Sequence, residues 1–131
     1  MMKKIFISFL ISLFFITYTF AIEKIYYCIE TASTGFDVAD NFEQKKYKPK
    51  RFKAEMDFER EHFSSPDIFM THTNCSYMIG EWSHTMQCDA PYGSMFVINT
   101  NNLKFTTFDS IGIAGNNDDD IAIAHGQCEE F

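Results

Sequence analysis

The first 21 residues constrain the fold most strongly, because they direct the chain to export and are then removed. Lys3 and Lys4 give a positive start, 5–20 is almost entirely apolar, and Ala21 completes a small-residue cleavage site. This order is typical of a secretory signal peptide. The apolar run is short for a membrane span, and the acidic Glu23 follows it closely. We therefore expect cleavage after residue 21 and a protein of the periplasm or the cell exterior, without a membrane anchor.

Removal of 1–21 from the 131 residues leaves 22–131, a length of 110 residues that fits a single domain. The mature chain keeps nine of the 11 basic residues and all 18 acidic ones, so its net charge is −9. This acidity argues against nucleic acid or an anionic membrane as a partner. We expect a monomer.

The four cysteines all lie in the mature chain. An even number of cysteines in a small exported chain predicts disulfides rather than free thiols. Cys28 and Cys128 lie in the expected first and last strands, which are neighbours in a closed meander, so we pair them with each other. Cys75 then pairs with Cys88. In strand 24–30 we expect Ile25, Tyr27 and Ile29 to face inward and Cys28 outward, and Cys128 to face outward with it.

Short apolar stretches separated by turn residues predict the fold class. The clearest is 52–59, where Phe52, Ala54 and Met56 alternate with charged residues. The other expected strands are 24–30, 68–73, 76–80, 84–88, 95–99, 103–109 and 121–128. Asp40 and Glu43 match a capping box for a helix of about two turns before Pro49. We predict an all-β, mainly antiparallel fold, a small up-and-down barrel or sandwich of about seven to eight short strands.

One basic segment stands out in this acidic chain. Six cations lie within nine residues: Lys45, Lys46, Lys48, Lys50, Arg51 and Lys53. Such a segment can bind an anionic glycan or an acidic protein surface. It can equally be a charged edge strand that prevents aggregation. Trp82, the only tryptophan, lies between two expected strands and is either a binding anchor or a cover for the end of the barrel.

Two groups of residues could instead form metal sites. His72, Cys75, His84 and Cys88 are zinc ligand types, but cysteines of an exported protein are usually oxidised. Asp118, Asp119 and Asp120 offer oxygen ligands for calcium without the spacing of an EF-hand. We read His125 as a structural residue at the margin of the core, and we expect neither a metal nor another cofactor.

No catalytic motif of the common hydrolase, nucleotide-binding or phosphate-binding types is present in the sequence. The chain combines an export signal with a four-cysteine meander that ends in Gly126-Gln-Cys128. In size and architecture it resembles the small β-barrel lysozyme inhibitors of the periplasm. We therefore expect a non-catalytic binding or inhibitor module. The alternatives are a metal-dependent or carboxylate-based hydrolase of cell-envelope material and an envelope structural protein.

Overall fold

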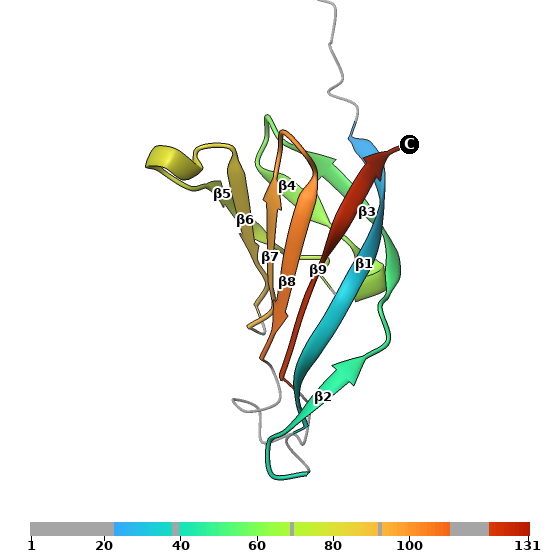
Figure 1. Cartoon of the computed structure of the whole chain (residues 1–131). Coiled ribbons are helices and arrows are strands. Elements are labelled where there is room, and N and C mark those ends of the chain that lie inside the picture. The colour runs from blue at the N-terminus through green and yellow to red at the C-terminus, as the bar shows by residue number, and fades with distance from the viewer. Residues whose placement is uncertain (1–22, 38–39, 69, 92, 111–120) are drawn as a thin grey trace, which may run out of the picture.

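The computed structural model describes residues 23–37, 40–68, 70–91, 93–110 and 121–131 (Figure 1). The expected signal peptide and the acidic loop Asp118–Asp120 lie outside these residues. Among the described residues, no helix is long and apolar enough to cross a membrane. The elements are β1 (Lys24–Asp37), β2 (Glu43–Tyr47), β3 (Arg51–Asp57), β4 (His62–Ser64), η2 (Pro66–Ile68), β5 (Asn74–Tyr77), η3 (Gly80–Trp82), β6 (Thr85–Asp89), β7 (Met95–Asn99), β8 (Lys104–Asp109) and β9 (Ile121–Glu130).

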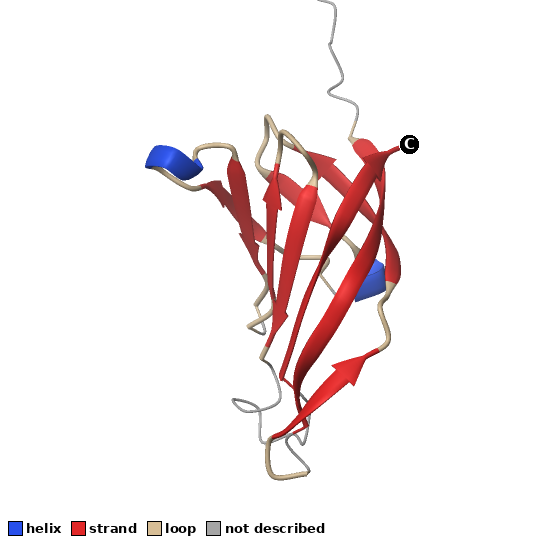
Figure 2. Ribbon diagram, viewed as in Figure 1, coloured by secondary structure: helices blue, strands red, loops and turns tan. Residues whose placement is uncertain are grey.

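The strands form one antiparallel sheet in the order β4-β3-β1-β9-β8-β7-β6-β5, and β2 pairs with β1 alone. The sheet curls into a nearly closed barrel, with two single-turn 3-10 helices, η2 and η3, outside the strands (Figure 2). The predicted all-β antiparallel barrel is confirmed. Its open side lies between β4 and β5, where the Thr73 hydroxyl donates to the Phe63 carbonyl and the Tyr77 hydroxyl donates to the Phe58 carbonyl.

The two disulfides join Cys28 to Cys128 and Cys75 to Cys88, as the sequence suggests. Both pairs lie directly opposite each other in the ladder, Cys28 on β1 and Cys128 on β9, Cys75 on β5 and Cys88 on β6. The first and last strands are therefore neighbours that a covalent bond holds together, and this bond fixes the barrel at its longest strand pair.

The predicted direction of Cys28 and Cys128 is wrong. Both are 1% exposed and lie in the core, whereas Ile25, Tyr27 and Ile29 face solvent. The expected pairing still holds because both ends of the predicted bond were assigned to the same side. Outside the barrel, the ring of Tyr27 packs edge-on against Phe131, 5.3 Å between centroids, with the Lys53 ammonium 5.4 Å away. These contacts stabilise Tyr27 on the solvent-exposed face of the sheet.

Two of the expected elements also differ from the structure. The segment from Asp40 forms a turn and then the strand β2, not a helix, because its residues pair along the lower half of β1. The expected strand at 68–73 is replaced by η2 and a bend, and strand β5 begins only at Asn74. Ser65 explains the change, because its N–H and carbonyl both bond to Met70 and close a tight loop there.

The core is aromatic where β3, β4, β7 and β8 meet. Phe63 stacks on Phe96 with 4.1 Å between ring centroids, and Phe96 stacks on Phe105 at 5.3 Å. Phe52 meets Phe105 edge-on at 5.4 Å. Met56 and Ile98 complete this packing and are at most 1% exposed. These side chains therefore fill the middle of the barrel.

Candidate functional site

A cavity of about 390 Å³ lies at the end of the barrel where β2 is attached. This volume is within the usual range for ligand pockets, about 300–1,000 Å³. We call it the end cavity. Its polar lining includes Glu30, Ser33, Lys50, Thr107 and Asp109, and its apolar lining includes Ile68, Met70, Phe108, Ala122 and Ala124.

Small side chains create this cavity. Thr107 of β8 and Ala124 of β9 lie opposite each other in the ladder, and Ala124 pairs in turn with Ser33 of β1. On β8 the next inward position toward the middle of the barrel is Phe105. Because β1, β9 and β8 all carry small residues at this level, the interior is hollow at this end, whereas aromatic rings fill the middle.

Glu30 lies on the inward face of β1, directly before a β-bulge. The register of β1 against β9 shifts between Glu30 and Ala32, so Thr31 is the extra residue. Glu30 is 6% exposed although it lies on the strand face that alternation marks as polar. The Lys50 N–H donates to Glu30 Oε2 at 2.7 Å, and the Glu30 N–H donates to the Lys50 carbonyl at 2.9 Å. These two bonds fix the carboxylate at the cavity wall.

The second carboxylate oxygen of Glu30, Oε1, accepts no hydrogen bond from any described residue, and because it is not one of the fully buried atoms without a partner, it keeps contact with solvent. No ion pair within 4.0 Å compensates its charge among the described residues, which contain every lysine and arginine from residue 23 onward. An accessible carboxylate oxygen without a protein partner can accept a hydrogen bond from a donor on a ligand. The end cavity therefore contains an acceptor that a ligand can satisfy.

The six cations of the basic segment do not form one surface. The Lys45 ammonium is 2.7 Å from Asp37 Oδ2, Lys50 lines the end cavity, and the Lys53 ammonium lies over the Tyr27 ring. Lys46, Lys48 and Arg51 are exposed. Lys46 lies on β2, whose second edge pairs with no other strand in the described part of the chain.

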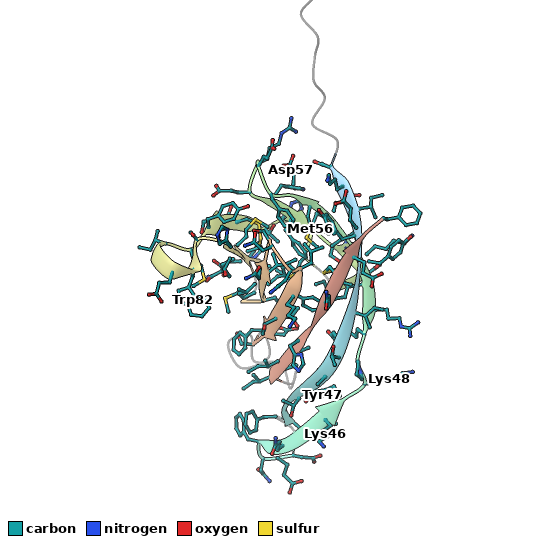
Figure 3. The ribbon with its side chains drawn as sticks, turned by 45° about the horizontal axis from the view of Figure 1, so that its top comes forward. Lys46, Tyr47, Lys48, Met56, Asp57 and Trp82 are labelled. Atoms are coloured by element: carbon teal, nitrogen blue, oxygen red, sulfur yellow. A yellow bond between two sulfur atoms is a disulfide. The ribbon has the colours of Figure 1, made fainter. Side chains whose placement is uncertain are left out.

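Trp82 lies far from the basic segment. Figure 3 shows it on the projecting η3 turn, whereas Lys46, Tyr47 and Lys48 lie together at the opposite corner of the molecule. Trp82 is 65% exposed and borders an outer hollow of about 540 Å³ that Met78, Val97 and His125 also line. His125 faces solvent, so its predicted place at the core margin is wrong. These residues form a second surface on the outside of the barrel.

The zinc alternative places two cysteines in the ligand set. In the structure the Cys75 and Cys88 sulfurs are bonded to each other, so they offer no thiolates to a metal beside His72 and His84. In the described ranges, no group of three or more His, Cys, Asp or Glu residues is arranged to hold a metal ion.

Sequence reasoning missed most of the end cavity. Of its lining, only Lys50 belonged to the predicted binding residues. Ser33, Ala122 and Ala124 carry no chemical signal, and their role appears only when the neighbouring strands β1 and β9 bring them together. Glu30 alternates with apolar residues as a solvent-facing strand residue does, and only its burial and its bonds to Lys50 show otherwise.

Comparison of the chain with protein-family models, with curated proteins and with solved structures found no match.

Proposed function

We propose that this protein is a small, exported, non-catalytic binding module that holds a small ligand in the end cavity. The observation that supports this function best is Glu30, a buried carboxylate with a free oxygen at the wall of a cavity of about 390 Å³. Ligand sites commonly combine apolar walls with a few fixed polar groups, and small barrels hold ligands at their ends. The aromatic core and the Cys28–Cys128 disulfide supply the rigid frame.

The experiment is a titration of the mature protein with 1-hexanol, a neutral amphiphile, followed by NMR. We expect the methyl signals of Ala122, Ala124 and Thr107 to shift. Ala124→Leu fills the cavity and should weaken binding at least tenfold, and Thr107→Leu on the facing strand is the second filling variant. Ala32→Leu adds the same side chain at an exposed position of β1 and is the control.

Absence of binding to the parent protein by both 1-hexanol and its amine analogue hexylammonium would overturn the proposal. Unchanged affinity in both folded filling variants would overturn it as well, because the ligand would then lie elsewhere.

Export is the second part of the proposal. The tripartite start of the sequence supports it, and so do two disulfides, which persist in oxidising compartments. The intact mass of the protein recovered outside the cytoplasm should correspond to residues 22–131. A recovered chain that still begins at Met1 or Met2 would contradict export with cleavage.

An anionic glycan remains a second candidate ligand, favoured by the exposed cations Lys46, Lys48 and Arg51. Binding of polygalacturonate should weaken with salt, because the Debye length is only about 8 Å at physiological ionic strength. Lys46→Glu/Lys48→Glu should abolish it, while Lys104→Glu, on the far strand β8, should not. Equal binding by parent and double variant at low salt would reject this candidate.

A further inference from the structure

We infer that the end cavity selects ligands that carry a positively charged nitrogen on a small apolar body, with Glu30 Oε1 as the acceptor. This inference rests on the proposed function, since it names the chemical class of the ligand that the end cavity holds. Two features favour an amine over a neutral or acidic analogue. They are the charged residues around the cavity and the apolar residues that surround the Glu30 carboxylate.

The first argument is the environment of Glu30. The residue is 6% exposed, one carboxylate oxygen accepts the Lys50 N–H, and the other accepts nothing from the described residues. An ammonium group in the cavity supplies both the missing hydrogen bond and the missing countercharge. A charge-assisted bond of this kind is roughly twice as strong as a bond between neutral groups. A neutral hydroxyl supplies only the hydrogen bond, and a carboxylate repels Glu30.

The second argument is the charge of the lining. Two carboxylates, Glu30 and Asp109, and one ammonium, Lys50, border the cavity. Asp109 accepts a hydrogen bond from the Ser94 hydroxyl at 3.2 Å and is exposed at the rim. Glu30 and Lys50 also line a neighbouring hollow beside Pro49, together with Lys48 and Arg51, and the Lys50 ammonium forms no ion pair with Glu30. The lining is therefore net negative, as is the mature protein as a whole.

The third argument is the apolar part of the lining. Met70 is 2% exposed and Ala124 is 4% exposed, and with Ile68 and Ala122 they provide hydrocarbon surface around the fixed carboxylate. A bare inorganic cation gains nothing from this surface, whereas an alkylammonium buries its chain there. The combination favours an amphipathic amine over a metal ion.

The test compares one alkyl chain with three head groups: hexylammonium, 1-hexanol and hexanoate, each titrated calorimetrically into the mature protein. We expect hexylammonium to bind at least tenfold more tightly than 1-hexanol, a difference of about 1.4 kcal/mol, and hexanoate to bind more weakly than both. Glu30→Gln keeps an oxygen for the Lys50 N–H and removes the charge. It should bring the affinity for hexylammonium down to that for 1-hexanol.

Two variants make the result specific. Glu129→Gln removes the same charge from the exposed face of β9 and should leave the preference for the amine unchanged. Lys50→Gln removes the positive side chain at the cavity while its backbone N–H stays, and it should raise the affinity for hexylammonium severalfold.

The outcomes separate the two proposals. If no member of the series binds, the proposed function fails. If 1-hexanol binds as tightly as hexylammonium, or if Glu30→Gln keeps the preference, the end cavity is a ligand site but the selectivity for amines is wrong.

Discussion

Glu30 and Lys50 are joined by two backbone-anchored hydrogen bonds that run in opposite directions. The Glu30 N–H donates to the Lys50 carbonyl at 2.9 Å, and the Lys50 N–H donates to Glu30 Oε2 at 2.7 Å. The two residues lie 20 positions apart, one at the bulge of β1 and one just before β3. This pair attaches the connection after β2 to the bulge, and it orients the carboxylate that borders the end cavity.

Gly126 should be intolerant of any side chain, because it faces this bulge across the ladder. An added Cβ would lie 2.1 Å from the Ile29 carbonyl oxygen and 2.7 Å from Phe105 Cζ. Backbone cannot rotate away, so we expect Gly126→Ala to lose about 3 kcal/mol of unfolding free energy, the upper end of typical overpacking costs. Gly80→Ala is the control. Its Cβ meets nothing within 4 Å, and its positive φ costs only about 1 kcal/mol. Urea denaturation compares them, and equal losses would contradict the crowding at Gly126.

The two disulfides should contribute unequally to stability. Cys28–Cys128 closes a separation of 100 residues and Cys75–Cys88 one of 13. In the chain-entropy model these loops correspond to about 4.7 and about 3 kcal/mol. Guanidinium unfolding of Cys28→Ala/Cys128→Ala should therefore show the larger loss relative to the parent. A larger loss from Cys75→Ala/Cys88→Ala would mean that packing around that pair outweighs loop entropy. The parent itself should show no reactive thiol after denaturation without reductant, since no described cysteine is free.

Alkaline pH should destabilise the fold through its buried tyrosines. Burial raises the pKa of Tyr26, and the negative charge of Glu130 raises it further. Burial also raises the pKa of Tyr77, with Glu61 as a second cause. The folded state thus holds these protons more tightly than the unfolded state, so stability is complete below the ordinary tyrosine pKa of about 10 and falls as the pH rises above it.

Tyr26→Phe tests this dependence, because it removes one of the two titrating hydroxyls and keeps the ring. Between pH 9 and pH 11 the variant should lose less unfolding free energy than the parent. An identical loss in the two proteins would show that Tyr26 ionises as freely in the folded state as in the unfolded state. Absorbance at 295 nm follows the phenolates directly.

The fold class could be predicted from the sequence because strand signals are local. The alternation of Phe52, Ala54 and Met56 with charged residues gave the correct inner face of β3. In β1 the same reasoning failed, because both faces carry apolar side chains: Ile25 and Ile29 on one, Tyr26 and Cys28 on the other. Which face is buried depends on the disulfide partner and on the space inside the barrel. Neither can be read from the sequence of one strand.

The candidate site was less predictable for a related reason. Thr31 adds one residue to β1, so the inward positions change from even numbers up to Glu30 to odd numbers from Ser33 onward. A pattern that is read without the bulge assigns the second half of the strand to the wrong face. The basic segment, by contrast, was visible at once in the sequence. In the structure its side chains are separated: Lys50 lines the end cavity, Lys45 pairs with Asp37, and Lys53 lies over the ring of Tyr27.

The most direct measurement of the central claim is a crystal structure of residues 22–131 with bound hexylammonium. The account predicts the nitrogen within hydrogen-bonding distance of Glu30 Oε1, and the alkyl chain against Met70 and Ala124. A ligand seated instead in the outer hollow beside Trp82, with the end cavity empty, would contradict it.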